Sequence, residues 1–395
     1  METYQLIAII LTALGILVTI VIYLDKKRRD NKAAAEKADK KVVDAVKAEV
    51  DDLKAQFERY RPLLDKVNPN PVPMGADEVP AEYGDIDRTA SAIVDRGGTI
   101  DSGELVRIGR LAYAKSDLAK AEHYFQVALD QSRESEDRLV QAQALGNLGL
   151  LMQDRGNLET ALNHHTTALV ISKELDHLQG SGASLGNIGL IYQAKGDLDA
   201  ALKYHQEALA IDREIGYRQG EASDLGNIGL IYQAKGDLDA ALKYHQEALD
   251  IHREVGYRQG EASALGNIGL IYQAKGDLDA ALKYHQEVLD IHREVGYRQG
   301  EANQLGNIGL IYQAKGDLDA ALKYHQEALA IDREIGYRQG EANQLGNIGL
   351  IYSDKGDLDA ALKYLQDALA ILDQHGLAHG RDVIERAIAD IESRR

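Results

Sequence analysis

One segment of forty residues recurs along most of this sequence. The copy at residues 186–225 reads GNIGLIYQAKGDLDAALKYHQEALAIDREIGYRQGEASDL, and four later copies closely resemble it. Including a looser copy and a degenerate one before it, seven units begin at Val106, Gly146, Gly186, Gly226, Gly266, Gly306 and Gly346. A repeat of this length is too small to bury its own apolar face and must pack it against its neighbours. The period therefore predicts a solenoid.

Each repeat is expected to form two helices. In the copy from Gly226, apolar residues recur at helical spacing in two stretches, which are separated by Lys235-Gly236-Asp237-Leu238. Gly236 suits a left-handed C-terminal cap, and Asp237 can cap the following helix by accepting backbone N–H bonds. A connection this short makes the two helices antiparallel neighbours. The expected fold class is therefore all-α, with about seven helical hairpins.

The repeat also resembles a known family. Its order of small and apolar residues is similar to the tetratricopeptide consensus, with matching positions at Leu185, Ile188, Gly189, Tyr192, Gly196, Ala201 and Ala208. The forty-residue length and the Leu-Gly-Asn triplet resemble the Leu-Gly-Asn (Pins/LGN) adaptors and, more distantly, kinesin light chains. The resemblance covers about Leu105 to Gly376. It implies a right-handed superhelix whose concave groove binds a segment of a partner protein.

The resemblance also indicates which residues would face that groove. In the tetratricopeptide family the register of the repeated Asn lies on the concave side, and an amide there can bind a peptide backbone as donor and acceptor. The Asn ladder comprises Asn147, Asn187, Asn227, Asn267, Asn307 and Asn347. The same face is expected to carry Leu190, Leu230, Leu270 and Leu310, followed by Gln193, Gln233, Gln273 and Gln313. The alternative is that each Asn bonds the neighbouring helix across the repeat joint.

A ladder of histidines could be mistaken for a metal site. His205, His245, His285 and His325 recur every forty residues, but Phe125 and Leu365 occupy the same register in the first and last units. A position that accepts Phe, His and Leu is a packing position, and ions bind ligands at only ~2 Å. We therefore expect no metal and no cofactor. No nucleophile–base pair or phosphate loop is evident either, so the sequence predicts a protein that is not an enzyme.

The central repeats differ from one another at only a few registers. The differences include those at Ser223-Asp224, Ser263-Ala264, Asn303-Gln304 and Asn343-Gln344, and those at Asp212, His252, His292 and Asp332. The first set borders the expected groove, so these differences either tune recognition or record drift after recent duplication.

Composition excludes other classes of protein. The chain has no Cys, which excludes disulfides and thiolate metal sites, and its net charge of -18 argues against nucleic-acid binding.

The sequence before the repeats predicts a membrane anchor. Leu6 to Leu24 is uncharged and apolar, and about 20 such residues cross a hydrocarbon core of ~30 Å. The basic cluster at residues 26–29 follows this run and nothing basic precedes it. The positive-inside rule then leaves the N-terminus outside and the repeats in the cytoplasm. The expected fold thus includes an N-terminal transmembrane helix in residues 1–25, which would contact the lipid bilayer.

Residues 26–66 predict a basic juxtamembrane segment and a helical stalk. Apolar residues in steps of three and four form a short coiled-coil seam, comprising Val43, Val46, Val50, Leu53, Phe57 and Tyr60. A seam this short is compatible with a parallel homodimer or with a lone helix.

The remaining boundaries follow from composition and periodicity. Residues 67–100 contain a proline-rich stretch that predicts an extended spacer, followed by a capping helix at residues 86–94. Repeats occupy residues 101–377. Residues 378–395 form an amphipathic C-terminal cap with Val383, Ile384, Ala387 and Ile391 on its apolar side.

Together these features predict a membrane-anchored, cytoplasmic scaffold that binds a protein or peptide ligand in its concave groove. Two alternatives remain open from the sequence, namely a self-assembling structural protein and a regulatory subunit of a membrane-associated complex.

Overall fold

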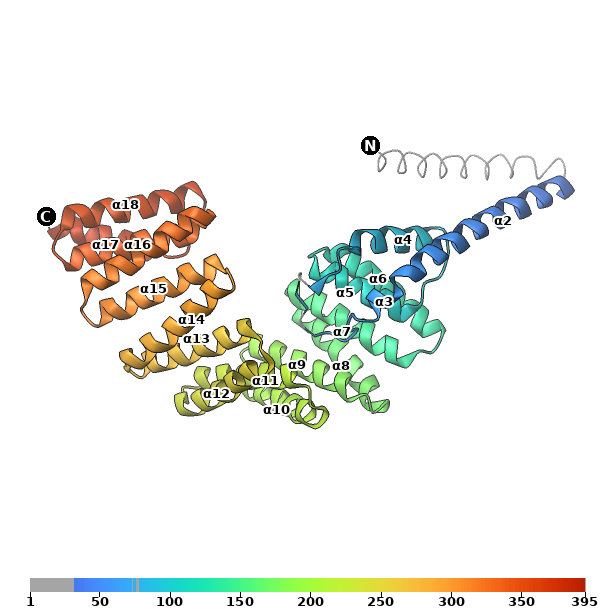
Figure 1. Cartoon of the computed structure of the whole chain (residues 1–395), viewed down its shortest axis with the longest axis horizontal. Coiled ribbons are helices and arrows are strands. Elements are labelled where there is room, and N and C mark those ends of the chain that lie inside the picture. Colours follow the sequence, from blue (N-terminus) through green and yellow to red (C-terminus); the bar gives the residue numbers. More distant parts are fainter. Residues whose placement is uncertain (1–31, 73, 76–77, 395) are drawn as a thin grey trace. The chain divides into compact units, whose positions relative to one another are not determined.

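The computed structural model describes residues 32–72, 74–75 and 78–394, and every regular element in these ranges is helical (Figure 1). The chain forms two compact units, residues 1–176 and 177–395. The first unit contains α2 (Lys32–Phe57), the short helices η1 (Glu58–Tyr60) and α3 (Arg61–Leu64), α4 (Tyr83–Asp95), α5 (Ser102–Ala114), α6 (Leu118–Glu134), α7 (Arg138–Asp154) and α8 (Leu158–Glu174).

The second unit contains five helical hairpins and a terminal helix. Its elements are α9 (Leu178–Ala194), α10 (Leu198–Ile215), α11 (Arg218–Ala234), α12 (Leu238–Val255), α13 (Arg258–Ala274), α14 (Leu278–Glu294), α15 (Arg298–Ala314), α16 (Leu318–Ile335), α17 (Arg338–Asp354), α18 (Leu358–Gln374) and α19 (Arg381–Arg394). Each hairpin packs against the next within this unit, as the forty-residue period predicts (Figure 1).

The turn inside each hairpin has the expected chemistry. Gly236 adopts a left-handed φ of 82°, which a residue with a side chain rarely adopts. The carboxylate of Asp237 accepts a hydrogen bond of 3.0 Å from the backbone N–H of Ala240 and so caps α12. The same turn recurs in the other repeats of this unit, which confirms the caps predicted from the sequence.

The histidine ladder packs the two helices of each hairpin together. The ring of His245 on α12 is fully buried against Gly229 on α11, where an added Cβ would lie 2.7 Å from Cε1 of the ring. Phe125 and Leu365 fill the same place against Gly109 and Gly349. The register is therefore a packing position. Among the described residues, no group of three or more His, Asp or Glu side chains is placed to hold a metal ion.

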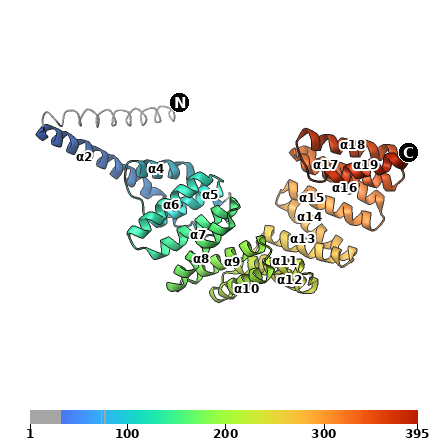
Figure 2. The same ribbon diagram turned by 180° about the vertical axis from the view of Figure 1, so that it is seen from behind.

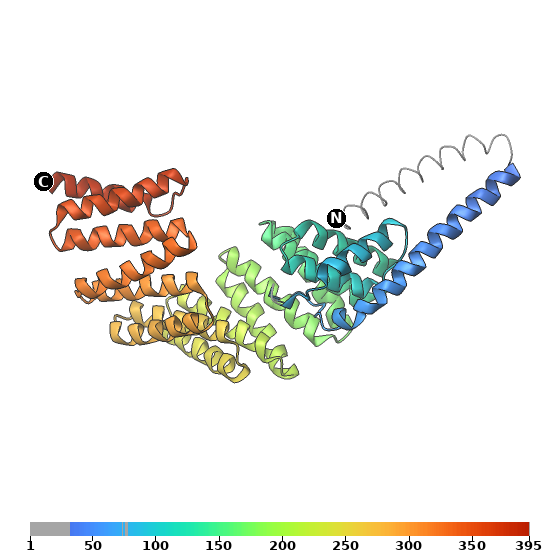
Figure 3. The same ribbon diagram turned by 45° about the horizontal axis from the view of Figure 1, so that its top comes forward.

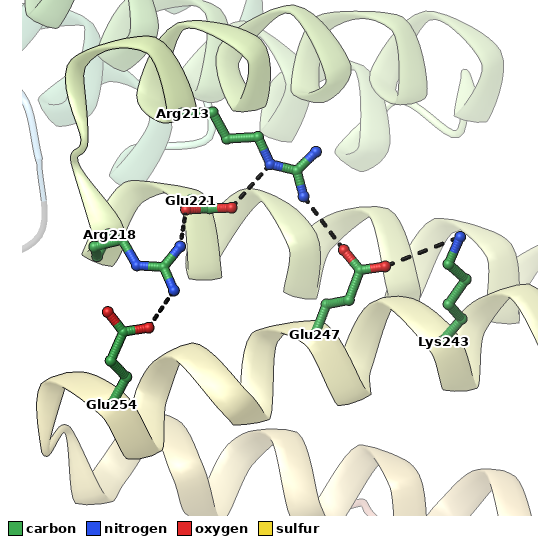
Figure 4. Close-up of polar contacts among 6 residues, drawn as sticks. All are labelled: Arg213, Arg218, Glu221, Lys243, Glu247 and Glu254. Carbon is green, nitrogen blue, oxygen red and sulfur yellow. Dashed lines mark hydrogen bonds and ion pairs between the residues drawn. The ribbon is translucent and has the colours of Figure 1, made fainter.

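Networks of ion pairs centred on a Glu cross the joints between hairpins within the second unit, and Figure 4 shows the one between α10 and α11. Glu221 on α11 accepts a hydrogen bond of 2.8 Å from Arg213 of α10 and pairs with Arg218, which also reaches Glu254 of α12. Arg213 in turn pairs with Glu247 at 3.3 Å. Glu221 is only 6% exposed, so its two arginines neutralise a carboxylate that burial would otherwise destabilise.

The same network repeats one joint later and shifts a pKa. Burial alone would raise the pKa of Glu261, but hydrogen bonds from Arg253 and Arg258 outweigh it and hold the pKa below its usual range. A carboxylate with a lowered pKa stabilises the fold above its unfolded pKa, and this contribution is lost as the pH falls through the folded value. The joints therefore weaken in acid.

The end of the stalk packs against its own chain. The C-terminal part of α2 lies beside α4 (Figure 3). Val50 and Phe57 of α2 are buried, and Glu49 pairs with Arg96 at 3.0 Å. These two members of the predicted seam therefore pack within their own chain, and the homodimer through the stalk stays a prediction. Val43 stays 63% exposed.

The proline-rich segment is packed rather than extended, so the prediction of a spacer is wrong. Val67 is 6% exposed, Asn70 is 3% exposed and Val79 is 9% exposed, and the two valines belong to the core of the first unit. The segment lies against α5 and α7, where Arg110 donates a hydrogen bond to the backbone oxygen of Val72 and Asn147 donates one to that of Pro69.

Helices also close both ends of the repeat array. In α4, Ile86, Ala90 and Ile93 are fully buried, and Asp87 accepts a hydrogen bond of 2.9 Å from the hydroxyl of Tyr124. At the other end, α19 packs on α18 through Ile384 and Ile391 (Figure 2). Val383, which was expected on the same apolar side, is instead 50% exposed.

The predicted anchor at Leu6 to Leu24 lies outside the described residues. Within the part of the chain that the structure describes, no helix has the length and apolar character needed to cross a bilayer.

Two glycine substitutions on α11 test how the hairpin packs. Replacing Gly229 with Ala should destabilise the protein by about 1–3 kcal/mol, because the new methyl group meets the His245 ring. Replacing Gly226 with Ala should leave stability unchanged or raise it by up to about 1 kcal/mol, because nothing lies within 4 Å of that Cβ and Ala favours a helix. Urea unfolding monitored by circular dichroism measures both, and equal effects would contradict the packing account.

Candidate ligand-binding face

The leucines of the predicted ladder are exposed to solvent. Leu190, Leu230, Leu270 and Leu310 are 39%, 36%, 44% and 40% exposed. Each lies on the first helix of a hairpin, three residues after a ladder Asn. A regular row of exposed large apolar side chains is unusual on a monomer surface and is typical of an interaction site.

A pocket of about 660 Å³ lies on this face of the second unit. It lies between α13, α14 and α15, and it brings together Asn267, Leu270 and Asn307 from the predicted groove set. Its other lining residues include Gly266 and Tyr297, and none of its lining residues is Asp, Glu, Lys or Arg. The pocket thus offers neutral donors and acceptors beside apolar surface, which suits an uncharged segment of polypeptide.

A smaller pocket of about 250 Å³ lies beside the C-terminal cap. Asn347 and Leu350 of α17 line it, together with Val383 and Ile384 of α19. The exposed Val383 therefore forms part of a pocket wall.

The ladder amides differ in how they are engaged. Within the described residues, the side chains of Asn227, Asn267, Asn307 and Asn347 have no hydrogen-bond partner, and all four are partly exposed. Asn187 is buried, at 7% exposure. The four partly exposed amides can therefore serve a ligand without giving up an internal bond.

Asn147 in the first unit shows a different arrangement, because its own chain covers it. Its amide donates hydrogen bonds of 2.8 Å to the backbone oxygens of Pro69 and Gln143, and it is 1% exposed. Its oxygen lies 3.4 Å from the guanidinium of Arg110, which itself donates to the backbone oxygen of Val72. In this unit the ladder Asn therefore binds one backbone carbonyl of the proline-rich segment, that of Pro69.

The predicted glutamines lie outside both of these pockets. In the earlier repeat, Gln153 contacts the ring nitrogen Nε2 of His165 at 2.9 Å, inside its own hairpin. Gln193 and Gln233 each have a buried side-chain oxygen, and Gln313 donates to Asp354 at 3.2 Å. None of Gln193, Gln233, Gln273 and Gln313 lines either of the two pockets.

Polar pairs that the sequence analysis missed lie beneath the face, at the joints. His205 contacts Asp224, His285 contacts Gln304 and His325 contacts Gln344, with distances between 2.8 and 2.9 Å. The available signal was the variation at the registers of Asp224, Gln304 and Gln344, which lie nineteen residues after a ladder His.

The remaining joint has Ala264 at this register, and neither ring nitrogen of the fully buried His245 has a partner. Burial lowers the pKa of His245 to about 4. This ring is therefore neutral near pH 7.

A second variable register holds buried carboxyl groups. Burial raises the pKa of Asp212 to about 7, with the charge of Asp224 adding to it, and burial raises the pKa of Asp332 to about 6. His252 and His292 replace these acids in the two repeats between them.

Comparison with known proteins identifies the repeat. A family model described as tetratricopeptide repeat matches residues 104–174, 140–214, 180–254, 222–294, 260–334 and 300–374. The chain belongs to the tetratricopeptide repeat family. A search of curated protein sequences found no significant match.

Solved structures with the same fold include three that each match 67% or more of this chain. A signal-transduction ATPase with numerous domains (STAND), with a tetratricopeptide repeat sensor, from Pyrococcus horikoshii is 18% identical, with a TM-score of 0.64, over 78% of this chain and 46% of that one. The apo quorum sensor NprR from B. thuringiensis is 16% identical, with a TM-score of 0.52, over 87% of this chain and 99% of that one. Apo RapI is 16% identical, with a TM-score of 0.52, over 67% of this chain and 96% of that one. At these low sequence identities, the similarity to the three structures shows a shared fold and nothing more about this tetratricopeptide repeat protein.

Replacing Asp332 with Asn should stabilise the second unit at high pH only. The folded pKa of about 6 exceeds the ordinary Asp pKa of 3.8, so between these values the folded state keeps a proton that the unfolded state loses. The contribution of the Asp332 carboxyl to the free energy of unfolding is therefore fully present in acid, and it is lost as the pH rises through the folded pKa. We expect the variant to gain about 1–3 kcal/mol at pH 8 and nothing below about pH 4.

Urea unfolding at both pH values measures this difference. The exposed Asp250, replaced with Asn, is the matched control and should show no gain at either pH. An equal gain at both pH values for Asp332→Asn would contradict ionisation as the cause.

Proposed function

We propose that this tetratricopeptide repeat protein is a non-enzymatic adaptor whose second unit binds a segment of a partner protein. The observation that carries the proposal is the neutral pocket that joins Asn267 and Asn307 to the exposed Leu270. Amides without internal partners provide hydrogen bonds for a peptide backbone, and the leucine provides apolar contact.

The sequence adds a location to this proposal. The apolar run from Leu6 to Leu24, followed by basic residues 26–29, supports an adaptor held at a membrane with its repeats on the cytoplasmic side. Membrane fractionation of the full chain and of a chain beginning at Asp25 tests this location, because only the full chain should sediment with membranes.

Replacing Asn227, Asn267 and Asn307 together with Ala should weaken partner binding at least about tenfold. Each lost hydrogen bond contributes about 0.5–1.5 kcal/mol, and 1.4 kcal/mol corresponds to a factor of ten. Stability should change little, because these partly exposed amides have no internal partner among the described residues. Quantitative crosslinked capture from native membranes, followed by mass spectrometry, measures the loss.

Two controls keep this result interpretable. The exposed Asn163 of the first unit, replaced with Ala, should leave capture unchanged. Circular dichroism should show that the triple variant keeps its helical content. Unchanged capture by a folded triple variant would exclude the Asn ladder as the binding site.

A further inference from the structure

In the first unit, a segment of the chain already occupies the ladder register. We call the adjacent Gly and Asn that contact it, here Gly146 and Asn147, a seat. The backbone oxygen of Pro69 accepts a hydrogen bond of 2.8 Å from Asn147, and the ring of Pro71 lies over Gly146. An added Cβ on Gly146 would come within 2.7 Å of Pro71 Cγ, so only glycine leaves room for the ring. The α7 helix therefore contacts this turn at two points. Asn147 binds the carbonyl of Pro69, and Gly146 leaves room for the ring of Pro71, two residues later.

The backbone of this seated segment is neither helix nor strand. The N–H of Val72 donates to the oxygen of Asn70 at 2.8 Å, which bends the chain around Pro71. Arg110, one repeat earlier, donates to the oxygen of Val72. The segment thus runs from the second repeat toward the first, opposite to the order of the repeats.

The same glycine–asparagine pair recurs in the second unit, where two of its copies are open. Nothing lies within 4 Å of a Cβ added to Gly226 or Gly266. The other copies face side chains of this chain, which are Asp224 at Gly186, Gln344 at Gly306 and Ile384 at Gly346. Gly266 and Asn267 also line the large pocket, so the open seat there is continuous with a cavity.

We propose that the partner segment bound by the second unit is a non-helical Pro-Xaa-Pro sequence, with its second proline over Gly266 and the carbonyl of its first proline on Asn267. This inference rests on the proposed function and specifies its ligand. The segment runs opposite to the repeats, so residues before the first proline lie toward Asn307 and those after the second lie toward Leu230.

The chemistry of the seat supports this ligand. Leu230 occupies the register that Arg110 has in the first unit, and it is 36% exposed. The ligand residue after the second proline would therefore contact an apolar side chain, where Val72 contacts a guanidinium. The pocket has no Asp, Glu, Lys or Arg in its lining, which disfavours a charged segment. Proline fixes its own backbone and therefore loses less conformational entropy on binding than other residues.

A second copy of this chain is not the occupant. Its own Pro-Xaa-Pro segment is buried in its first unit, where Asn70 is 3% exposed and Pro71 is also buried. A segment held within its own chain competes at a high effective concentration, so it leaves that seat rarely. The partner is therefore another protein that presents such a segment.

A fluorescent peptide with the sequence of residues 66–75, KVNPNPVPMG, tests the seat. Fluorescence anisotropy with the purified full chain should show binding that weakens at least about tenfold when Gly226 and Gly266 are both replaced with Ala. These substitutions add a methyl group where the proline ring would lie, while the surrounding open space leaves the fold intact. A peptide in which alanine replaces the first two prolines, those of Pro69 and Pro71, should bind the wild-type protein at least about tenfold more weakly.

A matched glycine provides the control. Gly84 lies in α4 and also has nothing within 4 Å of an added Cβ, so Gly84→Ala should leave peptide binding unchanged. Equal binding of both peptides, or equal binding by the Gly226→Ala/Gly266→Ala protein, would overturn the proposal. Concentration-dependent dimers that the peptide dissociates would overturn it in favour of a second copy.

The two proposals can fail separately. If the peptide does not bind while the Asn227, Asn267 and Asn307 variant still loses its captured partner, the Pro-Xaa-Pro ligand is wrong and the adaptor stands. If capture is also unaffected in that variant, both fail.

Discussion

Every hairpin in this protein depends on a ring or branched side chain that fills the gap beside a glycine. His245 against Gly229 shows the contact: the glycine lets the second helix approach closely, and the buried ring fills the space that a side chain on the first helix would take. Phe125 and Leu365 serve equally well in the end repeats. Shape and volume therefore decide this contact, and the chemistry of the imidazole is secondary.

Close packing inside the hairpins leaves other tasks to other surfaces. Arginine–glutamate networks such as that of Arg213, Glu221 and Arg218 connect one hairpin to the next. Among the described residues, the exposed leucines and the partly exposed asparagines of the first helices take no part in these networks. Their regular placement supports the ligand-binding role that we propose.

The sequence was most informative where the same residue recurs. Period and turn chemistry predicted the hairpins, and the exchange of His for Phe or Leu predicted that the ladder packs. The contacts of the glutamines could not be predicted, because helical spacing alone does not distinguish the open face of a helix from its flank, where Gln153 contacts His165.

The docking of the proline-rich segment could not be predicted in the same way. Its composition is typical of a spacer, and its contact with Asn147 joins residues 78 positions apart. Only the packed structure shows that Val67 and Val79 are buried in a core. The same holds for the ion-pair networks, whose partners lie up to 36 residues apart, as with Arg218 and Glu254.

The salt bridge between Lys235 and Asp199 joins one repeat to the next, and it recurs between Lys275 and Asp239 and between Lys315 and Asp279. Such a linkage is formed entirely by nearest neighbours. Loss or gain of one whole forty-residue copy by unequal recombination would regenerate this bridge at the new junction. Array length can therefore evolve in unit steps, with the reach of the recognition surface changing while the architecture is inherited intact.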